Sequence, residues 1–141
     1  MQIFWIALGS ALGGSARYGL DQLAVALGIT AFPVSTFIVN LSGSLLIGYL
    51  AGLLAAGGAA TPHPYKWHFW MTGVCGGYTT FSAFSWQVLS LIEQGHGDLA
   101  GFYAAFSIVT GLFAVWAGLS WGSVRLKESR RYGTRSTHPV F

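Results

Sequence analysis

Neutral polar side chains form two stripes in parts of this sequence that are otherwise apolar. Within each stripe the residues are three or four positions apart, which places them on one face of a helix. Polar groups without partners are disfavoured in apolar surroundings, so two such stripes favour a hydrated or ion-bearing pathway. The stripes consist of Thr36, Asn40 and Ser44, and of Tyr103, Ser107 and Thr110.

The alternative for the Ser and Thr hydroxyls is a hydrogen bond to a carbonyl of their own helix, which is a common arrangement. Asn40 is harder to explain in this way. Its side-chain amide has a donor end and an acceptor end, and its own helix cannot satisfy both. Asn40 is therefore the residue of these stripes that most needs a partner elsewhere.

Two phenylalanines follow a glycine-rich segment. Residues 73–80 contain three glycines and two threonines, which predicts an irregular helix. Irregular backbone at membrane depth is tolerated only where it is buried in protein or lines a polar cavity. Phe81 and Phe84 come directly afterwards and share one helix face. Their positive ring edges suit contact with a small anion, and the alternative is ordinary packing.

The ionisable residues exclude several classes of protein. None of the four carboxylates lies near the middle of the last three apolar segments, so a proton-coupled antiporter or divalent-cation carrier is not supported. The four histidines lack helical H-x-x-x-H spacing, and the single cysteine, Cys75, excludes an internal disulfide or a multi-cysteine metal site. No nucleophile motif indicates a hydrolase. We therefore expect the protein not to be an enzyme.

Charged residues are too sparse to cover a soluble surface. They make up 8% of the 141 residues, against 53% for hydrophobic residues, and none occurs in residues 22–65, 67–92 or 99–124. A membrane-spanning helix needs about 20 apolar residues. The sequence therefore predicts an all-α integral membrane protein with a four-helix membrane domain at 1–124 and a basic, flexible tail at 125–141. The expected spans are about 3–27, 34–56, 67–93 and 99–124, and the first is taken as a span because a signal peptide would have a basic start.

Three segments resemble the Fluc (CrcB) family of fluoride ion channels. They read GGSARY at 13–18, VNLSGS at 39–44 and GVCGGYTTFSAFS at 73–85, and the third is the most specific. The resemblance covers all four expected spans and leaves out the tail. It implies an antiparallel dimer of four-helix subunits, a third helix broken at its centre, two fluoride pores lined from both subunits, and a structural sodium ion at the dimer centre.

The resemblance also implies roles for individual residues. Phe81 and Phe84 would present ring edges to fluoride, and Asn40 would be their polar partner. Tyr103 and Ser107 correspond to a polar track in the last span. Thr36 and Thr110 complete the set of candidate pore residues.

Three further positions have roles that the same resemblance implies. The backbone carbonyls of Gly76 and Thr79 would bind sodium, a hard cation that prefers oxygen ligands, and Arg17 would lie near an aqueous vestibule. One position departs from the family pattern. Some members have a hydroxyl four residues after Ser107, where this chain has Gly111, so the inner end of the polar track is left open.

We therefore expect passive, selective fluoride export across the inner (plasma) membrane, conferring fluoride resistance. The expected partners are fluoride, the lipid bilayer and a second antiparallel subunit, with no nucleic acid. The alternatives are a small four-helix antiporter, which lacks its expected buried carboxylate, and a non-conducting membrane assembly subunit, in which the polar stripes would join helices.

Charge placement bears on the identity of the second subunit. With four spans, six basic residues and both termini fall on one side of the membrane, and none falls in the other two loops. The positive-inside rule then favours a cytoplasmic tail, whereas an antiparallel homodimer needs insertion in both orientations. A homodimer is favoured over a heterodimer with a paralogue, because late charges do not always decide topology. The six are Lys66, Arg125, Lys127, Arg130, Arg131 and Arg135.

Overall fold

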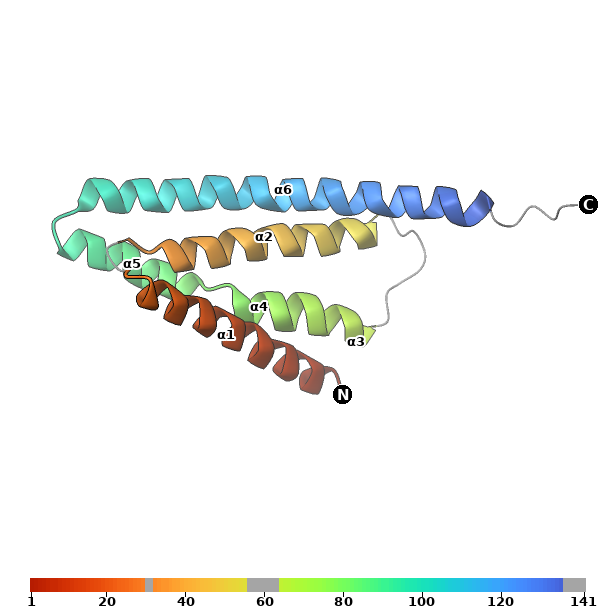
Figure 1. Cartoon of the computed structure of the whole chain (residues 1–141), viewed down its shortest axis with the longest axis horizontal. Helices are drawn as coiled ribbons and strands as arrows, with labels where there is room; N and C mark the ends of the chain where they lie inside the picture. The colour runs from red at the N-terminus through yellow and green to blue at the C-terminus, as the bar shows by residue number, and fades with distance from the viewer. Residues whose placement is uncertain (30–31, 56–63, 136–141) are drawn as a thin grey trace, which may run out of the picture.

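The computed structural model describes residues 1–29, 32–55 and 64–135, and all regular structure in these ranges is helical (Figure 1). The predicted all-α class is therefore confirmed for the described chain. One element, η1, is a π-helix, with backbone hydrogen bonds five residues apart. The elements are α1 (Gln2–Ala26), α2 (Val34–Ala55), α3 (Pro64–Trp67), η1 (His68–Cys75), α4 (Gly76–Tyr78), α5 (Phe81–Glu93) and α6 (Gly97–Arg135).

The helices lie roughly along one direction and pack in pairs. Helix α2 runs beside α6, α1 packs against η1 and α4, and α5 packs against the first part of α6 (Figure 1). Leu91, Ala100 and Tyr103 form a buried apolar cluster where α5 meets α6. This cluster anchors α5 at the end of the molecule where α5 and α6 join.

Helix α6 is longer than the sequence predicted. The expected span ended near residue 124, but the helix continues to Arg135. The first part of the segment assigned to a flexible tail is therefore helical, because nothing in residues 125–135 breaks a helix before its end. Residues 136–141, the rest of that predicted tail, lie outside the described chain.

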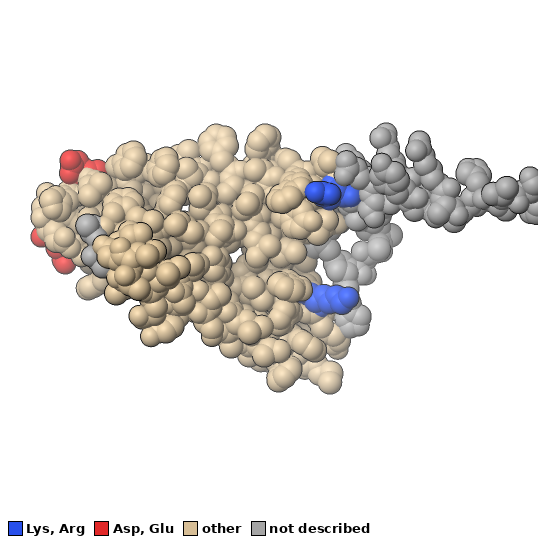
Figure 2. Space-filling view, viewed as in Figure 1, with Lys and Arg blue, Asp and Glu red and all other residues tan. Residues whose placement is uncertain are grey.

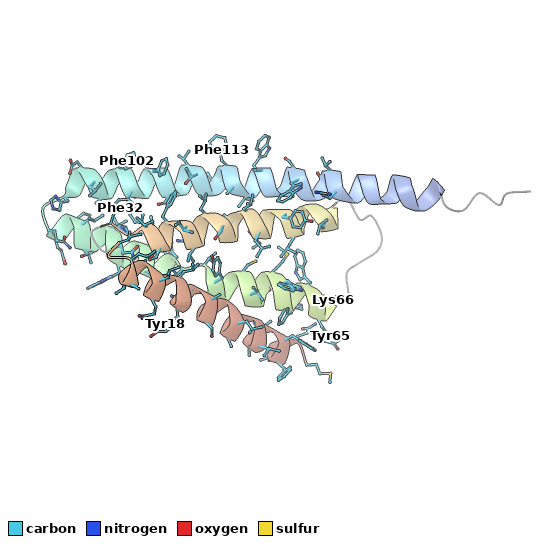
Figure 3. All side chains as sticks on the ribbon, viewed as in Figure 1. Tyr18, Phe32, Tyr65, Lys66, Phe102 and Phe113 are labelled. Carbon is cyan, nitrogen blue, oxygen red and sulfur yellow. The ribbon has the colours of Figure 1, made fainter. Side chains whose placement is uncertain are left out.

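Within the described residues, two helices are long and apolar enough to cross a membrane. They are Val34–Leu53, with mean hydropathy 1.6, and Gly97–Arg125, with mean hydropathy 1.8. Only 11% of the residues in the α6 window are buried, and Phe102 and Phe113 point outward from this helix (Figure 3). Apolar side chains that remain exposed on a folded chain are compatible with contact to lipid.

Opposite charges lie at opposite ends of the molecule. The acidic residues shown in Figure 2 lie at the end where α5 and α6 join, whereas the basic residues visible in that view lie at the other end, where Figure 3 labels Lys66. No charged residue occurs in α6 between Asp98 and Arg125. The apolar middle of α6 therefore separates the acidic residues shown in Figure 2 from the basic residues visible in that view, whereas Arg17 lies in α1 near Gly77.

Glycines allow α2 and α6 to approach closely. A Cβ added at Gly48 would lie 2.9 Å from Cα of Val115, and a Cβ added at Gly52 would lie 2.9 Å from the backbone nitrogen of Ser123. The same occurs in α1, where a Cβ on Gly9 would lie 2.9 Å from the nitrogen of Val74. Small residues at four-residue spacing permit such close packing in a membrane, where helices gain little from the hydrophobic effect.

We predict that Gly48→Ala destabilises the fold. The added methyl group overlaps the backbone of Val115, and forced overpacking typically costs about 1–3 kcal/mol. The free energy of unfolding, measured by circular dichroism during SDS titration of the purified protein, should fall by about this amount. Gly101→Ala is the matched control in α6, since a Cβ there meets nothing within 4 Å. Equal stabilities of the two variants would contradict the prediction.

Candidate functional site

The helical path is interrupted between α4 and α5. Thr79 has φ −76° and ψ 158°, and Thr80 has φ −149° and ψ 121°, so both have extended backbone. The sequence predicted an irregular helix over residues 73–80, on the basis of three glycines and two threonines. In the structure Gly73, Gly76 and Gly77 are helical, and the two threonines carry the extended conformation.

Two of these glycines serve close packing against α1. A Cβ on Gly73 would lie 2.9 Å from Cα of Gly9, and one on Gly77 would lie 2.7 Å from Cα of Ser10. A side chain at either position would push α1 away from η1 and α4. The glycines therefore hold this segment against its neighbour and do not break it.

Asn40 holds the extended segment in place. Its Nδ2 donates a hydrogen bond to the Thr80 carbonyl at 2.9 Å, and the Thr80 N–H donates to Asn40 Oδ1 at 2.8 Å. Both ends of the amide thus have partners outside α2. Backbone groups without partners are costly at membrane depth, and this pair of bonds satisfies two of them. The Nδ2 group carries a second hydrogen, which leaves a donor beyond the one used by Thr80.

Thr80 also caps α5. Its hydroxyl oxygen accepts a hydrogen bond from the Ala83 N–H at 3.1 Å, as expected of a threonine at the start of a helix. Together with Asn40, this cap fixes where α5 begins. The orientation of Phe81 and Phe84, both in the first turn of α5, follows from that starting point.

The same contacts leave two carbonyls without their usual helical donors. In a continuous helix the Gly76 carbonyl would accept from the Thr80 N–H, and the Thr79 carbonyl from the Ala83 N–H. Here these two amides donate to Asn40 Oδ1 and to the Thr80 hydroxyl. The carbonyl oxygens of Gly76 and Thr79 therefore suit a cation that prefers oxygen ligands.

Three aromatic rings follow the interruption. The Phe81 and Phe84 centroids are 5.9 Å apart, and the Phe84 and Tyr103 centroids are 5.4 Å apart. Phe81 is 79% exposed, whereas Phe84 is half-buried beside the α5–α6 cluster. The rings thus run from the surface of the chain into its interior.

A cavity of about 540 Å³, called here the polar cavity, lies beside the interruption. It brings together six of the predicted site residues and Ser44 from the first polar stripe. No carboxylate and no basic side chain is among its lining residues in the described chain. Those seven residues are Asn40, Ser44, Gly76, Thr79, Phe81, Phe84 and Ser107.

Ser107 is among the residues that line this cavity. Its Oγ is buried and has no hydrogen-bond partner within the described chain. A buried hydroxyl of this kind is available to a ligand or to water. Gly111 is one turn further along α6, and a Cβ there would lie 3.7 Å from Ser44 Oγ, an ordinary contact distance. An alanine at 111 would therefore fit without displacing α2.

Thr36 and Tyr103 lie outside the polar cavity and are joined through a residue that the sequence analysis missed. Gln87 Nε2 donates to Thr36 Oγ1 at 2.8 Å, and the Tyr103 hydroxyl donates to Gln87 Oε1 at 3.0 Å. Thr36 and Tyr103 are 3% and 1% exposed. An amide three residues after Phe84, on the same face of an apolar helix, was the feature that would have identified Gln87.

Two other predicted residues lie apart from this set. The Thr110 hydroxyl donates to the Phe106 carbonyl at 2.6 Å, which is the bond within its own helix that the sequence left open as an alternative. Arg17 Nε approaches the Gly77 carbonyl at 3.5 Å, on the α1 side of the interruption. Neither residue is among those that line the polar cavity.

Comparison with known proteins identifies the family. A family model described as CrcB-like protein, Camphor Resistance (CrcB), matches residues 4–119. The chain belongs to this family. The match includes every candidate site residue and ends before the basic C-terminal part of α6.

Curated relatives in the CrcB family are similar over most of their length. The "Fluoride-specific ion channel FluC" of Methylocella silvestris is 43% identical over 118 residues, which cover 84% of this chain and 90% of that protein. The protein of the same name from Flavobacterium psychrophilum is 44% identical over 118 residues, covering 83% and 93%. These relatives are named as ion channels. The expectation of a non-enzymatic, membrane-embedded family member is thus confirmed.

We predict that Asn40→Leu destabilises the protein. Leucine has a similar volume but loses both bonds to Thr80, and leaving buried polar groups without partners costs about 1–3 kcal/mol for each group. The free energy of unfolding should fall accordingly in SDS titration. Ser120→Ala is the control, because the Ser120 hydroxyl donates to the Trp116 carbonyl of its own helix. An Asn40→Leu protein as stable as the control would show that Thr80 does not depend on this amide.

Proposed function

We propose that this chain forms a fluoride-selective passive channel that lets fluoride leave the cytoplasm. The observation that carries the proposal is the polar cavity, which offers hydroxyl and amide donors and aromatic rings but no ionised side chain. Fluoride holds its water tightly, so a pore must replace hydration with fixed donors. The names of the relatives support fluoride as the ion.

We further propose four membrane spans. They are α1, α2, the segment from α3 to α5, and α6, with the third span interrupted at Thr79 and Thr80. The length and hydropathy of α2 and α6 support this arrangement, as do the exposed apolar side chains of α6. We place the protein in the inner (plasma) membrane.

An antiparallel dimer with two pores completes the proposal. One chain leaves Phe81 79% exposed at the polar cavity, so the ring edge has no cover from its own subunit. A second subunit would close the cavity and keep lipid away from the ion. We favour a homodimer over a pair with a paralogue, although the basic residues gathered at one end favour a single orientation.

A structural sodium ion belongs to the same proposal. The carbonyls of Gly76 and Thr79 would hold it, since their usual helical donors bond elsewhere. Sodium would place a positive charge directly at these two carbonyl oxygens, and so would stabilise the backbone interruptions of the two subunits. It would take no part in conduction.

The test of function is an efflux measurement. Liposomes loaded with fluoride and containing the purified full chain should release it when a potassium ionophore balances the charge, as detected by a fluoride electrode. Chloride-loaded liposomes, followed with a chloride electrode, should release chloride no faster than protein-free liposomes, because chloride is too large for a narrow dehydrating pore. Equal fluoride and chloride release, or no fluoride release, would contradict the proposal.

A second prediction concerns the ring edges. Phe81→Ile and Phe84→Ile should each lower fluoride flux by about tenfold or more, because losing about 1.4 kcal/mol at the ion corresponds to a factor of ten. Phe113→Ile is the matched control, since Phe113 is 66% exposed on the outer face of α6 and does not line the polar cavity. Normal flux in both cavity variants, with the control also normal, would remove the rings from the mechanism.

A further inference from the structure

A second cavity lies at the basic end of the molecule. It has a volume of about 390 Å³ and lies where the start of α1 meets α3 and the start of η1, near the labelled Tyr65 and Lys66 of Figure 3. We call it the aromatic groove. It shares no lining residue with the polar cavity. Its lining residues are Trp5, Tyr65, Lys66, Phe69 and Trp70.

The rings of the groove are arranged edge to face. Trp5 and Phe69 meet at 85° with centroids 6.1 Å apart, and Phe69 and Trp70 meet at 88° with centroids 5.2 Å apart. Trp5 remains 38% exposed and Trp70 48% exposed. The indoles therefore present apolar surface outward that packing within the chain does not cover.

Lys66 places a positive charge at the edge of these rings. It is exposed, and the next charged residue along the chain is Glu93, so it marks the boundary of an apolar span. Within the described chain no ion pair involves it, and Figure 2 shows the acidic side chains at the opposite end. Those acidic side chains are therefore too far away to repel an anion bound at Lys66.

The groove combines the features of a headgroup site at the membrane surface. Tryptophan and tyrosine favour the level of the lipid headgroups, and lysine near the surface attracts anionic lipid. The groove joins a single cation to indole rings at the end of an apolar span. This combination suits a lipid better than a protein partner. The chemistry of the groove matches a phosphate above an apolar chain.

We propose that the aromatic groove binds one anionic phospholipid. The phosphate lies against the ammonium group of Lys66, and the glycerol and the first part of an acyl chain lie among Trp5, Phe69 and Trp70. This site is independent of fluoride conduction, because none of its residues lines the polar cavity.

Lipid titration of the delipidated full chain by native mass spectrometry tests the proposal. Phosphatidylglycerol should bind about fivefold more tightly than phosphatidylcholine of the same acyl chains, as expected of one cation near a membrane surface. Lys66→Gln should abolish that preference, and Lys66→Arg should keep it. Arg125→Gln is the matched control, because it removes one charge from the same end but outside the groove. Trp70→Leu should weaken binding of both lipids.

Three results would overturn the proposal. Equal loss of preference in Lys66→Gln and Arg125→Gln would mean that the overall charge of this end attracts the lipid. Displacement of phosphatidylglycerol by an equal concentration of soluble glycerol phosphate would indicate a site for free phosphate. Unchanged binding of both lipids by Trp70→Leu would mean that the rings hold no lipid. Size-exclusion profiles equal to that of the parent protein establish that each variant is folded.

Discussion

The pairing of the Asn40 amide with the backbone of Thr80 is the interaction on which the rest of this structure depends. Two hydrogen bonds with this amide satisfy the N–H and the carbonyl of Thr80, whose extended backbone gives them no partner within a helix. Because Thr80 is held, its hydroxyl can start α5, and Phe81 and Phe84 face the polar cavity. The same pairing withdraws the Thr80 N–H from the Gly76 carbonyl. A single amide thus determines both the aromatic and the carbonyl features of the site.

Helix α2 secures α5 at a second point one turn away from the first. Thr36 bonds to Gln87, and Gln87 accepts from Tyr103, so three helices meet in one buried chain of hydrogen bonds. In a membrane such bonds join helices that the hydrophobic effect does not. The polar stripe of α2 therefore builds the fold as well as the cavity. Thr36 bonds to Gln87 and so joins α2 to α5. Asn40 has one N–H in addition to the one that bonds to Thr80.

The all-helical class follows from the charge-free stretches of the sequence, and the importance of Asn40 follows from the chemistry of its amide. The exact position of the interruption does not follow from the sequence, because it depends on contacts between helices. Gly73 and Gly77 stay helical since they lie against the backbone of α1, which sequence spacing alone does not reveal. The π-helix that contains Gly73 has no residue pattern of its own. Gln87 was missed because its two partners come from helices distant in the sequence.

The neutrality of the polar cavity places a constraint on how an anion can be held there. Because no ionised side chain lines the cavity, stabilisation there must come from dipoles: the Ser107 hydroxyl, the remaining Asn40 N–H and the ring edges. Dipoles replace hydration only where hydrocarbon is excluded, because an ion facing lipid loses its water without compensation. Phe81 is largely exposed on the single chain. Conduction is therefore a property we assign to an assembly, in which a second subunit supplies the missing wall.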